Sequence, residues 1–345
     1  MKNTINIFCI GILLLCCMAF EFANYTLDYP TYFPVPEYDL KNKPLTSDKI
    51  ELGKTLFYDP VLSKNESISC ASCHSPYNAF AHTDHDLSHG IYDQIGSRNA
   101  PPLFNLAWQN VFMWDGAINH LDVQSLAPIS SALEMGSNIS DVVTKLQKHD
   151  RYPALFYKAY KDSIVTGEHV LLALAQFQLT LVSASSKYDK VKNRNASFSE
   201  QEKNGYNLFL KNCNSCHQEP LFFNKGFASN GLVVDGTLND YGKWKNTKQS
   251  KDSLLFKIPS LRNLSYTYPY MHDGRFKKLN EVLNHYTNEI VMTDNLASEL
   301  NKGISLTSIE KADLISFLLT LNDKDFVFDE KHQVPKHFFT KPKDN

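Results

Sequence analysis

The sequence has little net charge and no long apolar run beyond its first residues. Its 345 residues include 35 lysines and arginines against 37 aspartates and glutamates, a formal net charge of -2. This balance gives no excess positive charge for binding nucleic acid and no polybasic patch for binding an anionic membrane. An apolar stretch at residues 170–182 is interrupted by Gln176 and Gln178 and is too short to span a bilayer of about 30 Å. The length and the 43% hydrophobic content indicate a globular protein of about two domains.

The N-terminus has the features of a signal peptide. Lys2 precedes an apolar run over residues 7–20, which is too short for a transmembrane helix but has the length of a signal-peptide core. We therefore predict that residues 1–22 are an export signal and that the protein acts in the periplasm. Lipid attachment to Cys16 or Cys17 near the end of this run is an alternative, although the two leucines before them are bulky for a lipoprotein cleavage site.

No cysteine beyond the signal segment stands alone. The remaining four form two Cys-x-x-Cys pairs, each followed directly by histidine: Cys70-Ala-Ser-Cys73-His74 and Cys213-Asn-Ser-Cys216-His217. Cys-x-x-Cys-His is the attachment signature of c-type haem, in which the thiols bond to the haem edge and the histidine binds the iron. A four-cysteine zinc site leaves both histidines unexplained, and a pair of redox disulfides is the other alternative. We predict two covalent haems.

The two halves of the chain repeat one another. With an offset of 158 residues, two segments of the first half align with two of the second. Pro101-Pro-Leu-Phe-Asn105 aligns with Pro259-Ser-Leu-Arg-Asn263, and Trp114-Asp-Gly116 aligns with His272-Asp-Gly274. We therefore predict a mainly α fold of two tandem c-type cytochrome domains, each with one haem. The expected boundaries are 23–190 for the N-terminal haem domain, 191–325 for the C-terminal haem domain and 326–345 for a C-terminal tail.

The same offset makes the two haems unlike each other. It aligns Pro128 of the first half with Tyr286 of the second. Proline offers no side-chain ligand, whereas tyrosine offers a phenolate. We infer that the His74 haem has an open distal face and that the His217 haem is closed by Tyr286, with His285 as the alternative ligand.

An open iron site needs acid–base groups. Gln124 precedes Pro128, and Glu134 follows it. A distal glutamate can take a proton from peroxide and return it to the leaving oxygen, which aids cleavage of the O–O bond. Gln124 can position the peroxide by hydrogen bonding.

Several segments together point to one family. They are the residues 51–63, the first haem motif, Arg98-Asn-Ala-Pro101, Trp114-Asp-Gly116 and Pro269-Tyr-Met-His-Asp-Gly274. This pattern resembles the di-haem bacterial cytochrome c peroxidases and MauG, from about residue 45 to about residue 321. The resemblance implies a peroxidatic haem in the N-terminal domain and an electron-transfer haem in the C-terminal one.

The resemblance also implies roles for further residues. Trp114 matches the tryptophan that carries electrons between the haems. Asn99, Thr267 and Pro269 match an inter-domain calcium site, and calcium prefers such oxygen ligands. His89 is the best match to a loop histidine that binds the resting N-terminal haem in many of these peroxidases, and whether it does so here stays open.

One departure separates the chain from most of these peroxidases. They have methionine where this chain has Tyr286, and a His/Met pair raises the reduction potential of haem iron. MauG-type enzymes have tyrosine there, and a phenolate favours oxidised iron. They also lack the loop ligand, so Tyr286 argues against His89 as a ligand.

The sequence therefore predicts an oxidoreductase of the cytochrome c peroxidase type. We expect hydrogen peroxide to be reduced at the His74 haem, with Glu134, Gln124 and Trp114 as catalytic residues. The second haem is expected to store or relay electrons from a small redox protein, a cytochrome c or a cupredoxin. The alternatives are MauG-like oxidation of a protein substrate and a non-enzymatic diheme electron carrier. A homodimer is a further expectation, and no nucleic-acid partner is expected.

Overall fold

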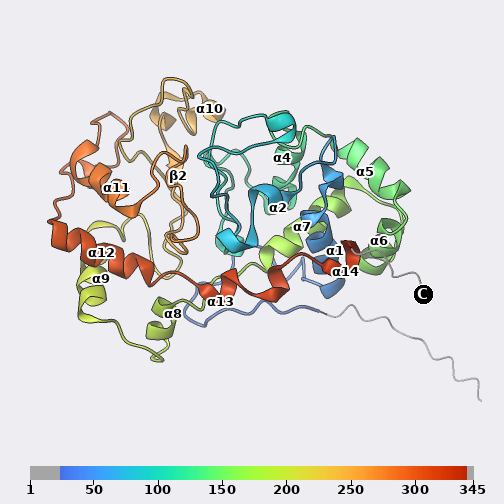
Figure 1. Cartoon of the computed structure of the whole chain (residues 1–345), viewed down its shortest axis with the longest axis horizontal. Coiled ribbons are helices and arrows are strands. Elements are labelled where there is room, and N and C mark those ends of the chain that lie inside the picture. The colour runs from blue at the N-terminus through green and yellow to red at the C-terminus, as the bar shows by residue number, and fades with distance from the viewer. Residues whose placement is uncertain (1–23, 340–345) are drawn as a thin grey trace, which may run out of the picture.

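The computed structural model describes residues 24–339, and these are mainly helical (Figure 1). The predicted signal segment with Cys16 and Cys17 lies outside the described residues, as does the end of the predicted tail, residues 340–345. Within the described part, no helix is long and apolar enough to cross a membrane. The predicted mainly α class is confirmed.

The helices gather in two lobes, with α1 to α7 in one and α9 to α12 in the other (Figure 1). In the first half the α-helices are α1 (Ser47–Tyr58), α2 (Cys70–Cys73), α3 (Leu121–Gln124), α4 (Leu126–Ser130), α5 (Ile139–Lys148), α6 (Tyr152–Tyr160) and α7 (Gly167–Leu179). In the second half they are α8 (Lys187–Lys192), α9 (Glu200–Asn212), α10 (Trp244–Thr247), α11 (Leu279–Asn284), α12 (Ser308–Leu319), α13 (Lys324–Val327) and α14 (Lys336–Phe339).

Short elements complete the connections. The strands β1 (Phe227–Ala228) and β2 (Phe256–Lys257) pair antiparallel, with Phe227 opposite Lys257. A π-helical turn, His285–Glu289, continues α11. The short 3-10 turns are Pro60–Leu62, Pro76–Asn78, Ile91–Asp93, Leu106–Trp108, Ser250–Asp252, Ser298–Leu300 and Glu330–His332.

Capping side chains set where the two long helices of the second lobe begin. At the start of α9, the Ser199 hydroxyl accepts from the Glu202 amide at 3.2 Å, and the Glu202 carboxylate accepts from the Ser199 amide at 2.7 Å. Thr307 and Glu310 form the same capping box at the start of α12. Each box satisfies amide groups that have no partner inside the helix.

Each lobe is built on one closely packed helix pair, α1 with α7 and α9 with α12. Both pairs meet at a glycine. A Cβ atom added to Gly53 of α1 would lie 1.8 Å from the carbonyl oxygen of Ala173, and one added to Gly205 of α9 would lie 1.9 Å from that of Asp313. Glycine therefore permits a backbone approach that no other residue allows.

The lobes have separate hydrophobic cores. The core of the first lobe includes Phe57 and Phe177 from the α1 and α7 pair. The core of the second lobe includes Phe209 and Phe317 from α9 and α12. The predicted tail crosses back over the molecule (Figure 1), and it buries three side chains in the core of the first lobe: Phe326, Val327 and Phe338.

A buried polar network joins the lobes. Asn105 and Asn263 both have left-handed backbone, with φ of 55° and 63°. The Asn105 amide donates to Leu181 O, and the Asn105 carboxamide binds the backbone of Ser183 through both its nitrogen and its oxygen. The Asn263 carboxamide donates to the Ser183 hydroxyl at 2.9 Å and accepts from the Asp323 amide at 2.8 Å. Ser183 thus holds both asparagine turns together.

A second buried contact is ionic. Arg262 is fully buried and donates two parallel hydrogen bonds of 2.8 Å to Asp189. Its guanidinium also donates to Pro220 O at 2.7 Å and lies over the ring of Phe33. Because Phe33 belongs to the segment before α1, the start of the described chain packs against the second half.

Candidate haem-attachment sites and distal pockets

The first Cys-x-x-Cys-His motif forms a single helical turn. Cys70 and Cys73 bound α2, and His74 follows directly. Nδ1 of His74 lies 2.9 Å from the carbonyl oxygen of Phe80. With Nδ1 donating, Nε2 is the nitrogen left to bind a metal. Burial lowers the pKa of His74 to about 4, so its imidazole is neutral and fit to be a ligand.

The second motif repeats this arrangement after α9. Nδ1 of His217 lies 3.0 Å from the carbonyl oxygen of Pro259. Burial lowers the pKa of His217 to about 4 and raises that of the Cys213 thiol to about 12. A histidine whose outer nitrogen is held by a carbonyl oxygen is the usual arrangement for a metal ligand.

Both motifs fit covalent haem better than the alternatives. The four cysteines Cys70, Cys73, Cys213 and Cys216 carry no disulfide. Cys70 packs against the core of the first lobe and Cys213 against the core of the second, so they do not form one four-cysteine zinc site. Each motif keeps two thiols and one oriented imidazole, which are the groups that haem c requires.

Glu134 faces the first motif. Its backbone lies against the motif's neighbouring loop, since the Ile91 amide donates to Glu134 O at 2.8 Å. Burial raises the pKa of the Cys73 thiol, and the negative charge of Glu134 raises it further. Burial also raises the pKa of Glu134 itself. Glu134 is therefore a half-buried carboxyl group that interacts with the first motif, and its role at a distal face stays a prediction.

Gln124 ends α3 and contacts the turn that carries Trp114. Its amide nitrogen lies 3.6 Å from the sulfur of Met113. Pro128 lies in α4, and its carbonyl oxygen accepts from the Met135 amide at 3.2 Å, which closes the turn that bears Glu134. The two predicted distal residues thus lie on the two sides of Pro128.

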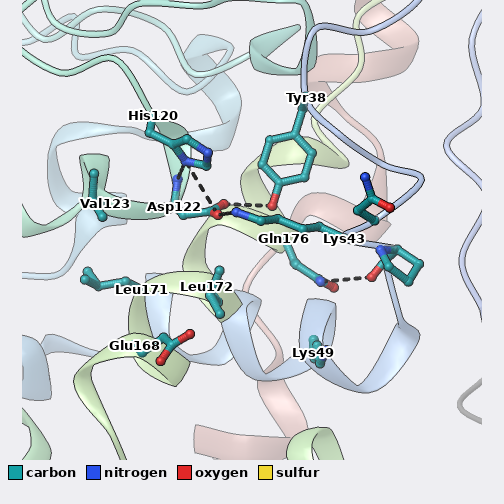
Figure 2. A pocket seen from close by; sticks show the side chains of 12 residues that line it. Tyr38, Lys43, Lys49, His120, Asp122, Val123, Glu168, Leu171, Leu172 and Gln176 are labelled. Atoms are coloured by element: carbon teal, nitrogen blue, oxygen red, sulfur yellow. Dashed lines mark hydrogen bonds and ion pairs between the residues drawn. The ribbon is translucent and has the colours of Figure 1, made fainter.

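The short helix α3 is fixed from its outer side by a polar cluster around Asp122 (Figure 2). Asp122 accepts from the Tyr38 hydroxyl at 2.7 Å and forms an ion pair with Lys43. Its amide donates to the His120 ring at 3.3 Å. These groups line a surface cavity of about 670 Å³. Because Asp122 and Gln124 share α3, the cluster fixes the helix that presents Gln124.

Tyr286 faces the second motif. Burial raises its pKa to about 12, and the charges of Cys213 and Cys216 act in the same direction. The Asn230 amide nitrogen lies 3.5 Å from the Tyr286 hydroxyl. The neighbouring His285, in contrast, has its Nε2 bonded to Asn230 O at 3.0 Å. Of the two predicted ligands, Tyr286 is the one that interacts electrostatically with Cys213 and Cys216, whereas Nε2 of His285 is bonded to a backbone carbonyl.

Tyr286 lies in the π-helical turn His285–Glu289. Such turns are frequent at functional sites. Met271 also reaches this place, with its sulfur 3.5 Å from the Asn230 amide nitrogen. Asn230, which contacts both, was not predicted, because the first half has no counterpart that marks it.

Trp114 lies where the two halves meet. Its indole N–H donates to Asn99 O at 2.9 Å, and its carbonyl oxygen accepts from the Lys257 amide at 2.7 Å. Arg98, next to Asn99, reinforces the junction, because it pairs with both Asp115 and Asp240. Trp114 is thus bonded to both halves of the chain.

The residues named for calcium are buried, and one of them, Asn99, lies at this junction. Asn99, Thr267 and Pro269 all have low exposure. The Asn99 amide donates to His272 O at 2.7 Å, and its side chain donates to Asp86 O at 3.0 Å. Asn99 therefore links the loop after the first motif to the turn that contains His272.

His89 is turned toward the surface. Its Nδ1 lies 2.9 Å from Asp93, and its ring lies 4.0 Å from that of His85. Only its backbone contacts the first motif, where the Cys73 sulfur lies 3.4 Å from His89 O.

Comparison with known proteins decides the family. The profile of the di-haem cytochrome c peroxidase family matches residues 47–197. The methylamine utilization protein MauG of Methylophilus methylotrophus is 35% identical over 301 residues, which cover 85% of this chain and 87% of that protein. This chain belongs to the di-haem cytochrome c peroxidase family. It is therefore an oxidoreductase, and the family implies two haem c groups.

Other similar proteins are named either cytochrome c peroxidase or MauG. The cytochrome c551 peroxidase of Nitrosomonas europaea is 33% identical, over 81% of each chain. A solved structure of a MauG-like protein associated with microbial copper homeostasis has a TM-score of 0.81 and 28% identity, over 90% of this chain and 99% of that one. The diheme peroxidase BthA of Burkholderia thailandensis, at 22% identity and a TM-score of 0.73 over 82% of this chain and 88% of that one, supports the fold alone. The family and the enzyme class predicted from the sequence are confirmed, and the electron-carrier alternative is set aside.

Proposed function

We propose that the chain reduces hydrogen peroxide at a haem bound by His74, while a second haem, bound by His217 and Tyr286, stores or relays electrons. One observation carries this proposal, namely the different residues that face the two motifs. A half-buried carboxyl group, Glu134, interacts with the first motif, and a half-buried phenol, Tyr286, interacts with the second. One site is thereby suited to proton transfer and the other to permanent ligation.

At the first site, the bound haem supplies the iron at which peroxide is reduced, and the protein supplies the proton path. Burial raises the pKa of Glu134 toward the range in which a carboxyl group both accepts and donates protons. Glu134 takes the proton from one peroxide oxygen and delivers it to the other as the O–O bond breaks. Gln124, held on α3, orients the peroxide by hydrogen bonding. Two electrons and two further protons complete the conversion to water.

Between the sites, Trp114 supplies an aromatic side chain at a residue bonded to both halves. The indole N–H donates to Asn99 O and the backbone carbonyl accepts from the Lys257 amide, and this anchoring of the indole suits electron transfer. The electrons come from a small redox protein, a cytochrome c or a cupredoxin, or from a protein substrate.

The remaining parts of the proposal concern the assembly. We assign one haem to each of the domains 23–190 and 191–325, and the matched asparagine turns at Asn105 and Asn263 support this repeat. A calcium ion at Asn99, Thr267 and Pro269 would stabilise the junction between them. The enzyme is exported to the periplasm, where c-type haem is attached, and a homodimer is its proposed assembly.

Substitution of Glu134 tests the acid–base role. Glu134→Gln keeps the size of the side chain but removes proton transfer, so the rate of reaction with peroxide should fall by about 10²-fold to 10⁴-fold. The matched control is Glu66→Gln, a surface glutamate with a 57% exposed side chain that pairs with Lys145. Stopped-flow absorbance of the ferric protein with peroxide measures both. An unchanged rate in Glu134→Gln would contradict the assignment.

Spectra of the isolated ferric protein test the difference between the sites. One haem should be high-spin and bind cyanide, and the other should be low-spin and unreactive. Two low-spin haems that ignore peroxide would overturn the proposal.

A MauG-like oxidation of a protein substrate is the second candidate. Tyr286 at the second motif favours it, as do relatives named MauG at 35% and 36% identity. Turnover with a reduced small cytochrome supports the peroxidase. Peroxide-dependent oxidation of a protein side chain without such a donor supports the second candidate.

A further inference from the structure

Three histidines lie together in the loop that follows the first motif. The rings of His82 and His85 are stacked with centroids 5.5 Å apart, and those of His85 and His89 are 4.0 Å apart. Nε2 of His82 lies 3.3 Å from Nδ1 of His85. Haem attachment and the distal pocket use none of these rings.

The separation of the two nitrogens suits a shared cation. Two imidazole nitrogens bound to one ion at about 2.0 Å in tetrahedral geometry lie about 3.3 Å apart. His82 and His85 already have this spacing, although a hydrogen bond between the rings has the same length. What distinguishes the two cases is the surroundings of the rings.

The outer nitrogens are held as they are in metal-binding histidines. Nδ1 of His89 lies 2.9 Å from the Asp93 carboxylate, which leaves its Nε2 for a ligand role. The ring of His82 is hydrogen-bonded to the backbone of Ser72. A carboxylate or a backbone carbonyl behind the ring orients a ligating histidine and fixes its tautomer. Burial lowers the pKa of His82, which favours the neutral imidazole that binds metal.

The loop is anchored at both ends of the cluster. The Asn78 side chain donates to the Thr83 hydroxyl at 2.8 Å, next to His82. At the other end, His89 pairs with Ile95 in an antiparallel bridge. The exposed Asp84 adds negative charge between these anchors, whereas the charge of Asp86 is paired with Lys277. Such a loop offers the imidazoles of His82 and His85 at a defined separation beside a carboxylate.

We propose that His82, His85 and His89 bind one divalent transition-metal cation, of the imidazole-preferring class of Cu²⁺ and Zn²⁺. Among the described residues, no group of three or more histidine, cysteine, aspartate or glutamate side chains is already arranged to hold a metal ion. His82 and His85 provide the pair in place, and His89, whose ring contacts His85, completes the set by a shift that keeps its Nδ1 on Asp93 and brings its Nε2 to the cation. The cation lies beside the first motif, where His89 O contacts Cys73 and the His82 ring is bonded to the backbone of Ser72.

Copper titration of the haem-loaded protein tests the site. Cu²⁺ is added to chelator-treated protein, and the bound metal is measured by equilibrium dialysis with elemental analysis and by electron paramagnetic resonance. The wild-type protein should retain one equivalent with nitrogen couplings from imidazole. The double variant His82→Asn/His85→Asn should bind at least about 100-fold more weakly. Asp93→Asn, at a residue with an 86% exposed side chain, should bind about 10-fold to 100-fold more weakly.

The matched control is His337→Asn, a surface histidine with a 75% exposed side chain that pairs with Glu51. It should bind copper as the wild type does. Haem absorption and the unfolding temperature confirm that each variant is folded. Three results would overturn the proposal: no bound copper in the wild type, equal binding in the double variant, or a copper spectrum without nitrogen couplings.

Discussion

Replacement of Gly53 by alanine should destabilise the first lobe, although alanine is the better helix former. In the interior of a helix, alanine is favoured over glycine by about 1 kcal/mol. At Gly53, however, the new methyl group would lie 1.8 Å from the backbone carbonyl oxygen of Ala173. A backbone atom cannot rotate away, so α1 and α7 must move apart.

The magnitude follows from these two terms. Overpacking of a core costs about 1–3 kcal/mol, and a contact with backbone belongs at the upper end of that range. After subtraction of the helix-propensity gain, we expect a net loss of about 2 kcal/mol or more. Gly205→Ala should lose a similar amount, because its Cβ would lie 1.9 Å from Asp313 O.

Urea unfolding of the haem-loaded protein, followed by circular dichroism, measures the effect. Gly236→Ala is the internal control, because no heavy atom lies within 4 Å of its added Cβ. That variant should be neutral or slightly stabilised, by up to about 1 kcal/mol. If Gly53→Ala and Gly236→Ala unfold at the same urea concentration, the close approach of α1 and α7 does not exist as described.

Two further predictions concern the second half. Arg262→Ala should destabilise the protein by about 3–5 kcal/mol in thermal or urea unfolding, because it leaves the buried Asp189 carboxylate without its partner. Burial raises the pKa of Asp189, but the hydrogen bonds and charge of Arg262 outweigh burial, so the pKa in the folded protein is lowered. The stability that this carboxylate contributes is therefore present above its unfolded pKa near 4 and is lost as the pH falls through the lower folded pKa. Arg262→Ala should not show this loss of stability at low pH. Tyr286→Met should raise the reduction potential of the second haem, on the order of 100 mV within the range of about 0.8 V that axial ligands span. Spectroelectrochemistry measures this, and an unchanged potential means that Tyr286 is not the ligand.

The sequence was informative where chemistry depends on local spacing. The family, the enzyme class and the helical class all follow from short patterns such as the two haem motifs. The assignment of Glu134 and Tyr286 to different haems rests on one offset between the halves and stays a prediction.

What could not be predicted depends on contacts between distant segments. Asn230 reaches Tyr286 from a loop with no periodic pattern, and the ion pair of Arg262 with Asp189 joins residues 73 positions apart. Of the three clustered histidines, only His89 stood out in the sequence, because the fold of the loop, rather than its sequence, stacks His82 on His85. The helices α13 and α14 are only four residues each, too short for a sequence period to predict them.

The crossing of the tail has a consequence for the order in which the molecule is completed. The core of the first lobe contains Phe326, Val327 and Phe338, which are among the last described residues to be synthesised. Until the tail docks, the core of the first lobe lacks these three side chains. The lobe that carries Cys70 and Cys73 is therefore completed by the end of the described chain, and a chain that stops before residue 326 would leave that core unfilled.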